Sequence, residues 1–121
     1  MTKRILVVED TEDNRQIIRD LLTSVGYEMI EALDGAQGVA MAAEHKPDLI
    51  LMDMQLPVLD GYEATRRIKA DPALAHIPVI AVTSYALSGD EAKTKAAGCN
   101  AYVAKPFSPR QLLAKVREFL G

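Results

Sequence analysis

The chain has 121 residues, of which 49% are hydrophobic and 26% are charged, and its net charge at pH 7 is −3. This length suits a single domain with one core, so we expect one domain over residues 1–121. The acidic balance gives no electrostatic case for binding nucleic acid or an anionic membrane, and no apolar stretch approaches the roughly 20 residues of a membrane span. A lone cysteine and the lack of a signal-peptide pattern predict a cytoplasmic protein.

Five short apolar segments recur along the chain and predict strands. They cover residues 5–9, 27–32, 49–53, 79–83 and 101–104. Three of these segments are almost continuously apolar, which is typical of central strands in a parallel sheet that is covered on both faces. The sequence therefore predicts a buried parallel sheet.

Helical patterns fill the intervals between these strands. The first predicted helix ends at Gly26 and places five apolar residues on one face: Ile17, Ile18, Leu21, Leu22 and Val25. A capping residue followed three positions later by Glu or Gln predicts where each later helix begins. These pairs are Asp34 with Gln37, Asp60 with Glu63, Ser88 with Glu91, and Ser108 with Gln111.

The last two predicted helices differ in their apolar faces. The fourth, which we expect to end at Gly98, has a small face made of Leu87, Ala92, Ala96 and Ala97. This small face predicts a weakly held helix. The fifth helix has a larger face made of Leu112, Leu113, Val116, Phe119 and Leu120. The lysines of the third and fourth helices, Lys69, Lys93 and Lys95, are interpreted as solvated.

Strict alternation of strands and helices predicts an α/β fold with three layers, in which an open, doubly wound, five-stranded parallel sheet lies between helices. In such sheets the functional crevice lies beyond the carboxyl ends of the strands. The residues at those ends are therefore the candidates for chemistry: Glu9 and Asp10, Asp53, Thr83 and Ser84, and Lys105.

The candidate residues suit phosphoryl transfer. Three carboxylates at one edge of a sheet repel one another, and a bound cation together with Lys105 would offset that repulsion. Hard oxygen ligands of this kind select Mg²⁺ or Mn²⁺. Asp53 is then the natural nucleophile toward phosphorus, while Thr83 and Lys105 would contact the phosphoryl oxygens.

Each of these residues also has a purely structural interpretation. Asp53 alone could be a turn or capping residue, and Glu9 with Asp10 could favour the N-terminus of the next helix. Thr83 could simply end a strand, and Tyr102 could serve packing alone. These alternatives lose weight only when all the positions are taken together.

Two other classes of protein fit less well. A small phosphatase with an Asp nucleophile looks like it requires a second Asp two residues later, where Gln55 stands. A flavin- or nucleotide-binding protein of this topology would need a phosphate-binding loop after the first strand, where "EDTEDN" would repel phosphate.

The motifs "VVED", "LMDMQLPVLDG", "AVTS" and "AKPFS", in this order and at these spacings, resemble the receiver domain of two-component response regulators over the whole chain. The resemblance implies the flavodoxin-like strand order 2-1-3-4-5. It also implies that Asp53 is the phospho-acceptor and that Glu9 and Asp10 hold Mg²⁺. The backbone carbonyl of Gln55 would complete the metal shell.

The resemblance assigns further roles near the carboxyl end of the chain. Thr83 matches the switch hydroxyl, Tyr102 matches the aromatic residue that follows it, and Lys105 matches the phosphate-binding lysine. The Lys105–Pro106 bond is expected to be cis, as it is in the family. We also hypothesise that Tyr85 and Gln55 shield the acyl phosphate from water.

The resemblance implies partners as well. The phosphoryl donor would be a histidine kinase or a histidine phosphotransferase, and the output would be contact with a downstream protein. We expect a stand-alone regulator that catalyses only its own phosphorylation and dephosphorylation, because the chain ends as the fifth helix finishes. A receiver excised from a hybrid histidine kinase is the alternative. The fourth helix, fifth strand and fifth helix are expected to repack on modification and to support weak homodimerisation.

Overall fold

Five apolar segments form one parallel sheet within residues 2–83 and 90–120, the part of the chain that the computed structural model describes. The order of the strands is β2-β1-β3-β4-β5. The strands are β1 (Arg4–Val8), β2 (Glu28–Ala32), β3 (Leu49–Asp53), β4 (Val79–Thr83) and β5 (Ala101–Ala104). The predicted α/β fold and its strand order are therefore confirmed. Every residue of β3 and β4 is buried, as expected for central strands.

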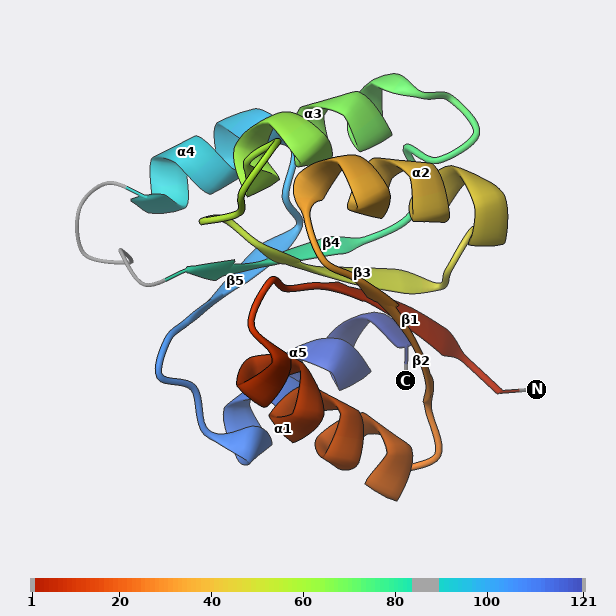
Figure 1. The fold of residues 1–121 in the computed structure, drawn as a ribbon, viewed down its shortest axis with the longest axis vertical. Helices are drawn as coiled ribbons and strands as arrows, with labels where there is room; N and C mark the ends of the chain where they lie inside the picture. Colours follow the sequence, from red (N-terminus) through yellow and green to blue (C-terminus); the bar gives the residue numbers. More distant parts are fainter. Residues whose placement is uncertain (1, 84–89, 121) are drawn as a thin grey trace.

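The helices cover the sheet in two layers, as Figure 1 shows. One layer holds α1 (Glu12–Ser24) and α5 (Pro109–Leu120), and the other holds α2 (Gly35–His45), α3 (Gly61–Ala70) and α4 (Asp90–Ala97). Side chains alternate along β1, so Ile5 and Val7 pack toward the first layer, while Leu6 and Val8 pack toward the second. Among the described residues, the helices are all too short or too polar to span a bilayer.

Helix starts follow the predicted capping residues where the structure describes them. Asp34, Asp60 and Ser108 each accept a hydrogen bond from the backbone N–H three residues later, at 2.8, 2.9 and 3.1 Å. Gln111 returns the bond by accepting from the Ser108 N–H at 3.3 Å, which completes a reciprocal capping box. The predicted start at Ser88 lies outside the described residues.

The buried face of α1 differs from the prediction. The helix does end before Gly26, whose φ of +90° suits a helix terminus. However, the side chain of Ile17 is 54% exposed. The buried residues are Arg15, Ile18 and Leu22, which recur at the i, i+3, i+7 spacing of one helix face. The core-facing stripe therefore starts with an arginine rather than with Ile17.

Helix α4 ends as predicted but turns a different face inward. Gly98 follows it with φ of +105°. Thr94 and Ala97 are buried, whereas Ala92 and Ala96, two residues of the predicted face, are exposed. The predicted face consisted mainly of alanines, and exposing a single methyl group costs little free energy, so the sequence pattern did not fix which face of this helix turns inward. Leu87, the remaining member of the predicted face, lies outside the described residues.

Candidate metal and phosphoryl-acceptor site

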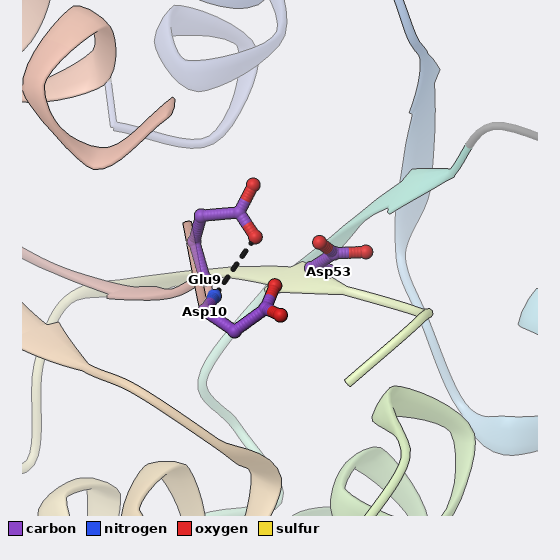
Figure 2. Close-up of side chains that lie close together, drawn as sticks. All are labelled: Glu9, Asp10 and Asp53. Carbon is purple, nitrogen blue, oxygen red and sulfur yellow. Dashed lines mark hydrogen bonds between the residues drawn. The ribbon is translucent and has the colours of Figure 1, made fainter. Parts of the chain in front are cut away.

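Acidic side chains emerge where β1 and β3 end. Backbone pairing continues to these points, since the Glu9 N–H donates to the Ala32 carbonyl at 3.1 Å and the residue after Asp53 donates to β4 at 3.0 Å. Glu9 and Asp53 are only 3% and 4% exposed, whereas Asp10 is exposed. One carboxylate oxygen from each of Glu9, Asp10 and Asp53 lies within 4.8 Å of the others (Figure 2). The sheet therefore gathers three carboxylates at one edge, as predicted from the strand ends.

Lys105 reaches this cluster from beyond the end of β5. Its backbone N–H donates to the Thr83 carbonyl at 2.8 Å, which extends the pairing of β5 with β4. Its Nζ lies 2.9 Å from Asp53 Oδ2 and 3.3 Å from Glu9 Oε1. The Lys105–Pro106 peptide bond is cis, as the resemblance implied. One ammonium group thus bridges acids from two different strands.

Asp53 is held on both carboxylate oxygens. Oδ2 accepts from Lys105, and Oδ1 accepts from the Gln55 backbone N–H at 2.9 Å. The following loop folds back closely, because a Cβ atom on Gly61 would lie 2.2 Å from the Asp53 carbonyl oxygen. Only glycine allows α3 to begin this close to the end of β3. The Asp53 carboxylate is therefore fixed by Lys105 on one oxygen and by the loop after β3 on the other.

Glu9 is fixed by contacts that the sequence analysis did not identify. Its Oε1 accepts from Asn14 Nδ2 at 2.7 Å, and its Oε2 accepts from the Asp10 N–H at 2.9 Å, the bond drawn in Figure 2. Its carbonyl accepts from Arg15 Nη1 at 2.9 Å. An arginine on the same helical stripe as Ile18 could have indicated this role, since a buried guanidinium requires polar partners.

The electrostatics of the site favour a bound cation. Burial raises the pKa of the Glu9 carboxyl, and the neighbouring Asp53 raises it further. Burial opposes the Lys105 ammonium, but the hydrogen bonds and charges of Asp53 and Glu9 outweigh this effect and raise the pKa of Lys105. Three carboxylates face one ammonium, so negative charge remains uncompensated. Hard oxygen donors with one exposed member fit Mg²⁺, which binds a few carboxylates and keeps several waters.

The other predicted site residues lie nearby or farther back in the sheet. Thr83 is fully buried at the end of β4, one residue beyond Val82, which pairs with Asp53. Tyr102 lies on the outermost strand β5, where it pairs with Ala81 of β4. Its side chain is partly buried and packs against the core on the α2–α3 side. Their predicted switch roles stay predictions. Ser84 and Tyr85, the residue of the shielding hypothesis, lie outside the described residues.

Comparison with known proteins places the chain in a family. The profile of the response regulator receiver domain family matches residues 5–117. The chain belongs to this family. It is 46% identical to the polar-differentiation response regulator DivK of Brucella ovis and to that of Brucella anthropi, over all of this chain and 98% of each relative. It is therefore a DivK-like receiver of two-component signal transduction, not a conventional enzyme, and its family implies a histidine kinase partner.

Solved receiver structures agree with this assignment. The receiver domain of sensor histidine kinase PA1611 from Pseudomonas aeruginosa PAO1 is 42% identical, with a TM-score of 0.93, over 100% of this chain and 99% of that one. That crystal structure holds a magnesium ion coordinated in the active site cleft. The chemotaxis protein CheY4 of Vibrio cholerae is 27% identical, with a TM-score of 0.92, over 98% of this chain and 99% of that one.

Proposed function

We propose that this receiver accepts a phosphoryl group on Asp53 from a histidine kinase or a histidine phosphotransferase. The observation that carries the proposal is the set of contacts around Asp53. Its carboxylate lies 2.9 Å from Lys105 Nζ and within 4.8 Å of ligand atoms of Glu9 and Asp10. A nucleophile, a cation that can bind phosphate and a metal-binding acid pair thus share one edge of the sheet.

The chain's own residues supply the chemistry of the transfer step. An Asp53 carboxylate oxygen attacks phosphorus, the P–N bond of the phosphohistidine breaks, and the imidazole nitrogen keeps the electron pair. Lys105 already donates to Asp53 and is placed to donate to an incoming phosphoryl oxygen, and the Thr83 hydroxyl would donate to another. Catalysis of this kind rests on positioning and electrostatics.

Magnesium would be held by Glu9, Asp10, Asp53 and the backbone carbonyl of Gln55. When bound, it neutralises charge on the transferred group. The donor set supports this proposal, and so does the magnesium ion in the PA1611 receiver. The exposed Asp10 leaves the site open toward solvent, from which the ion and the phosphoryl donor would enter.

The output of the switch would be a protein contact on the surface formed by α4, β5 and α5. A groove of about 580 Å³ runs along this surface, with Tyr102, Lys95 and Phe119 among its lining residues. Thr83 and Tyr102 would couple Asp53 to it, because adding about −1.5 to −2 charges at one point can bias a two-state element. The same surface would support weak homodimerisation.

Two settings for this receiver have support among its relatives. The match to 98% of the length of DivK favours a stand-alone regulator in a phosphorelay. The likeness to the PA1611 receiver favours the alternative, a receiver domain of a hybrid histidine kinase. In both settings the reaction at Asp53 is the same.

The test is phosphorylation by acetyl phosphate in the presence of Mg²⁺, followed by intact mass spectrometry. We expect the mass of one phosphoryl group on the wild-type chain and none on Asp53→Asn. Asp34→Asn is the matched control, because asparagine still caps α2 while one carboxylate is lost near the same edge. Phosphorylation of Asp53→Asn would contradict the proposal, and so would the absence of phosphorylation of the wild-type chain.

A further inference from the structure

Arg15 is a buried cation on the core-facing stripe of α1. Its side chain is 10% exposed, and it lies on the same helix face as Ile18 and Leu22. A guanidinium at such a position costs free energy unless its N–H groups are bonded. An aliphatic residue would complete the stripe without this cost, so the contacts of Arg15 are informative.

The guanidinium joins three elements. Nη1 donates to the Glu9 carbonyl at 2.9 Å, Nη2 pairs with Glu12 in the first turn of α1, and Nε lies 3.3 Å from Glu31 Oε1 on β2. The two glutamates hold the guanidinium in place by charge. The contact with Glu9 reaches the site itself, because this carbonyl belongs to the peptide that links Glu9 to Asp10.

The Glu9 and Asp10 side chains extend from either side of that peptide. The N–H of Glu9 is already fixed by the Ala32 carbonyl of β2 at 3.1 Å. Arg15 fixes the carbonyl on the other side of the same residue, just where the strand has ended and ladder pairing stops. The peptide from which the exposed Asp10 extends is thus held by Arg15 at its carbonyl and by the Glu9 carboxylate at its N–H.

We propose that Arg15 is a positioning residue of the divalent-cation site, acting through the Glu9 carbonyl to orient Glu9 and Asp10. The inference rests on the magnesium site of the proposed function. Mg²⁺ demands near-octahedral geometry at short oxygen distances, so it is sensitive to the direction of each carboxylate. Groups that orient metal ligands typically contribute 10- to 100-fold to metal affinity.

Arg19 provides a matched control within the same ion cluster. It is one turn further along α1 and pairs with the same two acids, Glu31 and, at 3.5 Å, Glu12. No contact between Arg19 and Glu9 is present in the described structure. Exchange of either arginine for methionine removes one positive charge near the acidic pocket. Charge alone would therefore tighten Mg²⁺ binding in both variants, whereas the positioning role predicts weaker binding in Arg15→Met only.

The experiment is calorimetric titration of the full chain with Mg²⁺ at fixed ionic strength. We expect the dissociation constant to rise about tenfold or more in Arg15→Met and to stay unchanged or fall in Arg19→Met. As a second readout, the Mg²⁺ concentration for half-maximal phosphorylation by acetyl phosphate should rise in Arg15→Met, while the rate at saturating Mg²⁺ stays near that of the wild type. Circular dichroism checks that each variant is folded.

Arg15→Lys serves if the methionine variant does not fold. It keeps the buried charge, but one ammonium lacks the planar fork that reaches Glu9, Glu12 and Glu31 together, so magnesium affinity should still fall. Wild-type affinity in the folded Arg15 variant, or an equal loss in Arg19→Met, would overturn the role of Arg15 alone. Absence of magnesium binding by the wild-type chain would overturn the proposed metal site and this role with it.

Discussion

The two ends of the parallel sheet each hold a partly buried lysine, and the two lysines meet opposite kinds of partner. At the carboxyl end, the Lys105 ammonium lies 2.9 Å from Asp53 and 3.3 Å from Glu9. Both partners are carboxylates, and a third, Asp10, is close by. This end therefore contains more negative charge than its lysine neutralises.

At the amino end, Lys69 meets neutral oxygens. Its Nζ donates to the carbonyls of Ala75 and Ile77 at 3.2 and 2.6 Å and to Asn100 Oδ1 at 3.0 Å. The ammonium thus joins α3, the segment before β4 and the residue before β5. The interpretation of Lys69 as a solvated side chain was wrong, because its acceptors are mostly backbone groups of segments that are distant in sequence.

The two lysines differ in the charge of the groups that accept their hydrogen bonds. An ammonium group has three N–H donors, and at the amino end three neutral acceptors use them within the fold. At the carboxyl end the acids outnumber the ammonium, which leaves negative charge that a bound cation would neutralise. The same residue type therefore joins segments of the fold at the amino end of the sheet and pairs with the acids of the proposed site at the carboxyl end.

The largest expected effect is a slower phosphorylation of the chain when Lys105 is exchanged for methionine. Methionine keeps much of the aliphatic stem but cannot donate to a phosphoryl oxygen, and loss of one positioned donor costs about 10²- to 10³-fold in rate. We expect phosphorylation by acetyl phosphate, followed by intact mass, to slow by about 100-fold or more. Lys69→Met loses the same charge at the other end and should keep the wild-type rate. Equal slowing in both variants would remove the functional distinction.

Lys69→Met should instead show its effect in stability. The change removes the ammonium donor from the partly buried Ile77 carbonyl and from the exposed Ala75 carbonyl, and a hydrogen bond from a charged group contributes about 1.5–3 kcal/mol. Urea denaturation should report a loss of that size in the free energy of unfolding. Lys93→Met, at an exposed position on α4, should stay within about 0.5 kcal/mol of the wild type. A loss no larger than that of this control would show that Lys69 does not join these segments.

A strained turn beside the site gives the next largest expected effect. Val58 has φ of +69°, and the Leu59 N–H donates to the Pro57 carbonyl at 2.7 Å, which defines a γ-turn. This conformation is unfavourable for a β-branched residue, whereas asparagine adopts positive φ more readily. Val58 is also 83% exposed, so its replacement loses little burial.

We therefore expect Val58→Asn to raise the free energy of unfolding by about 1 kcal/mol. Urea denaturation measures the change. Leu33→Asn is the control, because Leu33 is an exposed apolar residue without positive φ at the same end of the sheet. A gain in the control as large as in Val58→Asn would mean that exposed apolar surface, not backbone strain, is responsible.

The sequence predicted those features that depend on continuous apolar runs. β3, β4 and β5 have the predicted bounds, and β1 differs by one residue at each end. The acid cluster could be predicted because parallel strands bring their carboxyl ends to one edge of the sheet. Glu9 and Asp53 could therefore be placed together from the sequence alone. The same reasoning placed Lys105 beyond the end of the fifth strand, and the structure brings its Nζ within 3.3 Å of both acids.

The features that the sequence did not predict depend on tertiary contacts. Arg15 occupies a core-facing position only because Glu9, Glu12 and Glu31 surround it, while Ile17 points to solvent. Lys69 depends on backbone carbonyls, which every sequence has and no pattern distinguishes. Hydropathy reports which residues are apolar, but not which polar residues find partners inside.

The smallest predicted effect is a difference between the titrations of the two lysines. Burial lowers the pKa of Lys69, since its neutral acceptors do not compensate the lost hydration. Burial acts in the same direction on Lys105, but Asp53 and Glu9 outweigh it and raise the pKa. The ordinary value is 10.5 for both. Lys69 should therefore release its proton at a lower pH than Lys105.

The two shifts have opposite consequences for stability. The folded-state pKa of Lys105 lies above the unfolded value, so its contribution is complete below pH 10.5 and is lost as the pH rises through the folded pKa. For Lys69 the folded-state pKa is the lower one, so at neutral pH the protonated amine is less favourable in the fold than a neutral amine at the same site would be, and this cost is relieved as the pH rises from the folded pKa toward 10.5.

Carbon-13 NMR of the lysine Cε atoms in metal-free buffer measures both titrations in one sample. We expect Lys69 to titrate first, and Asp53→Asn to bring the Lys105 midpoint down while leaving that of Lys69 in place. The variant separates the two causes, because it removes a carboxylate partner of Lys105 and changes nothing near Lys69. If Lys105 titrated first in the wild-type chain, the carboxylates would not be compensating its burial, and the contrast between the two ends of the sheet would lose its electrostatic basis.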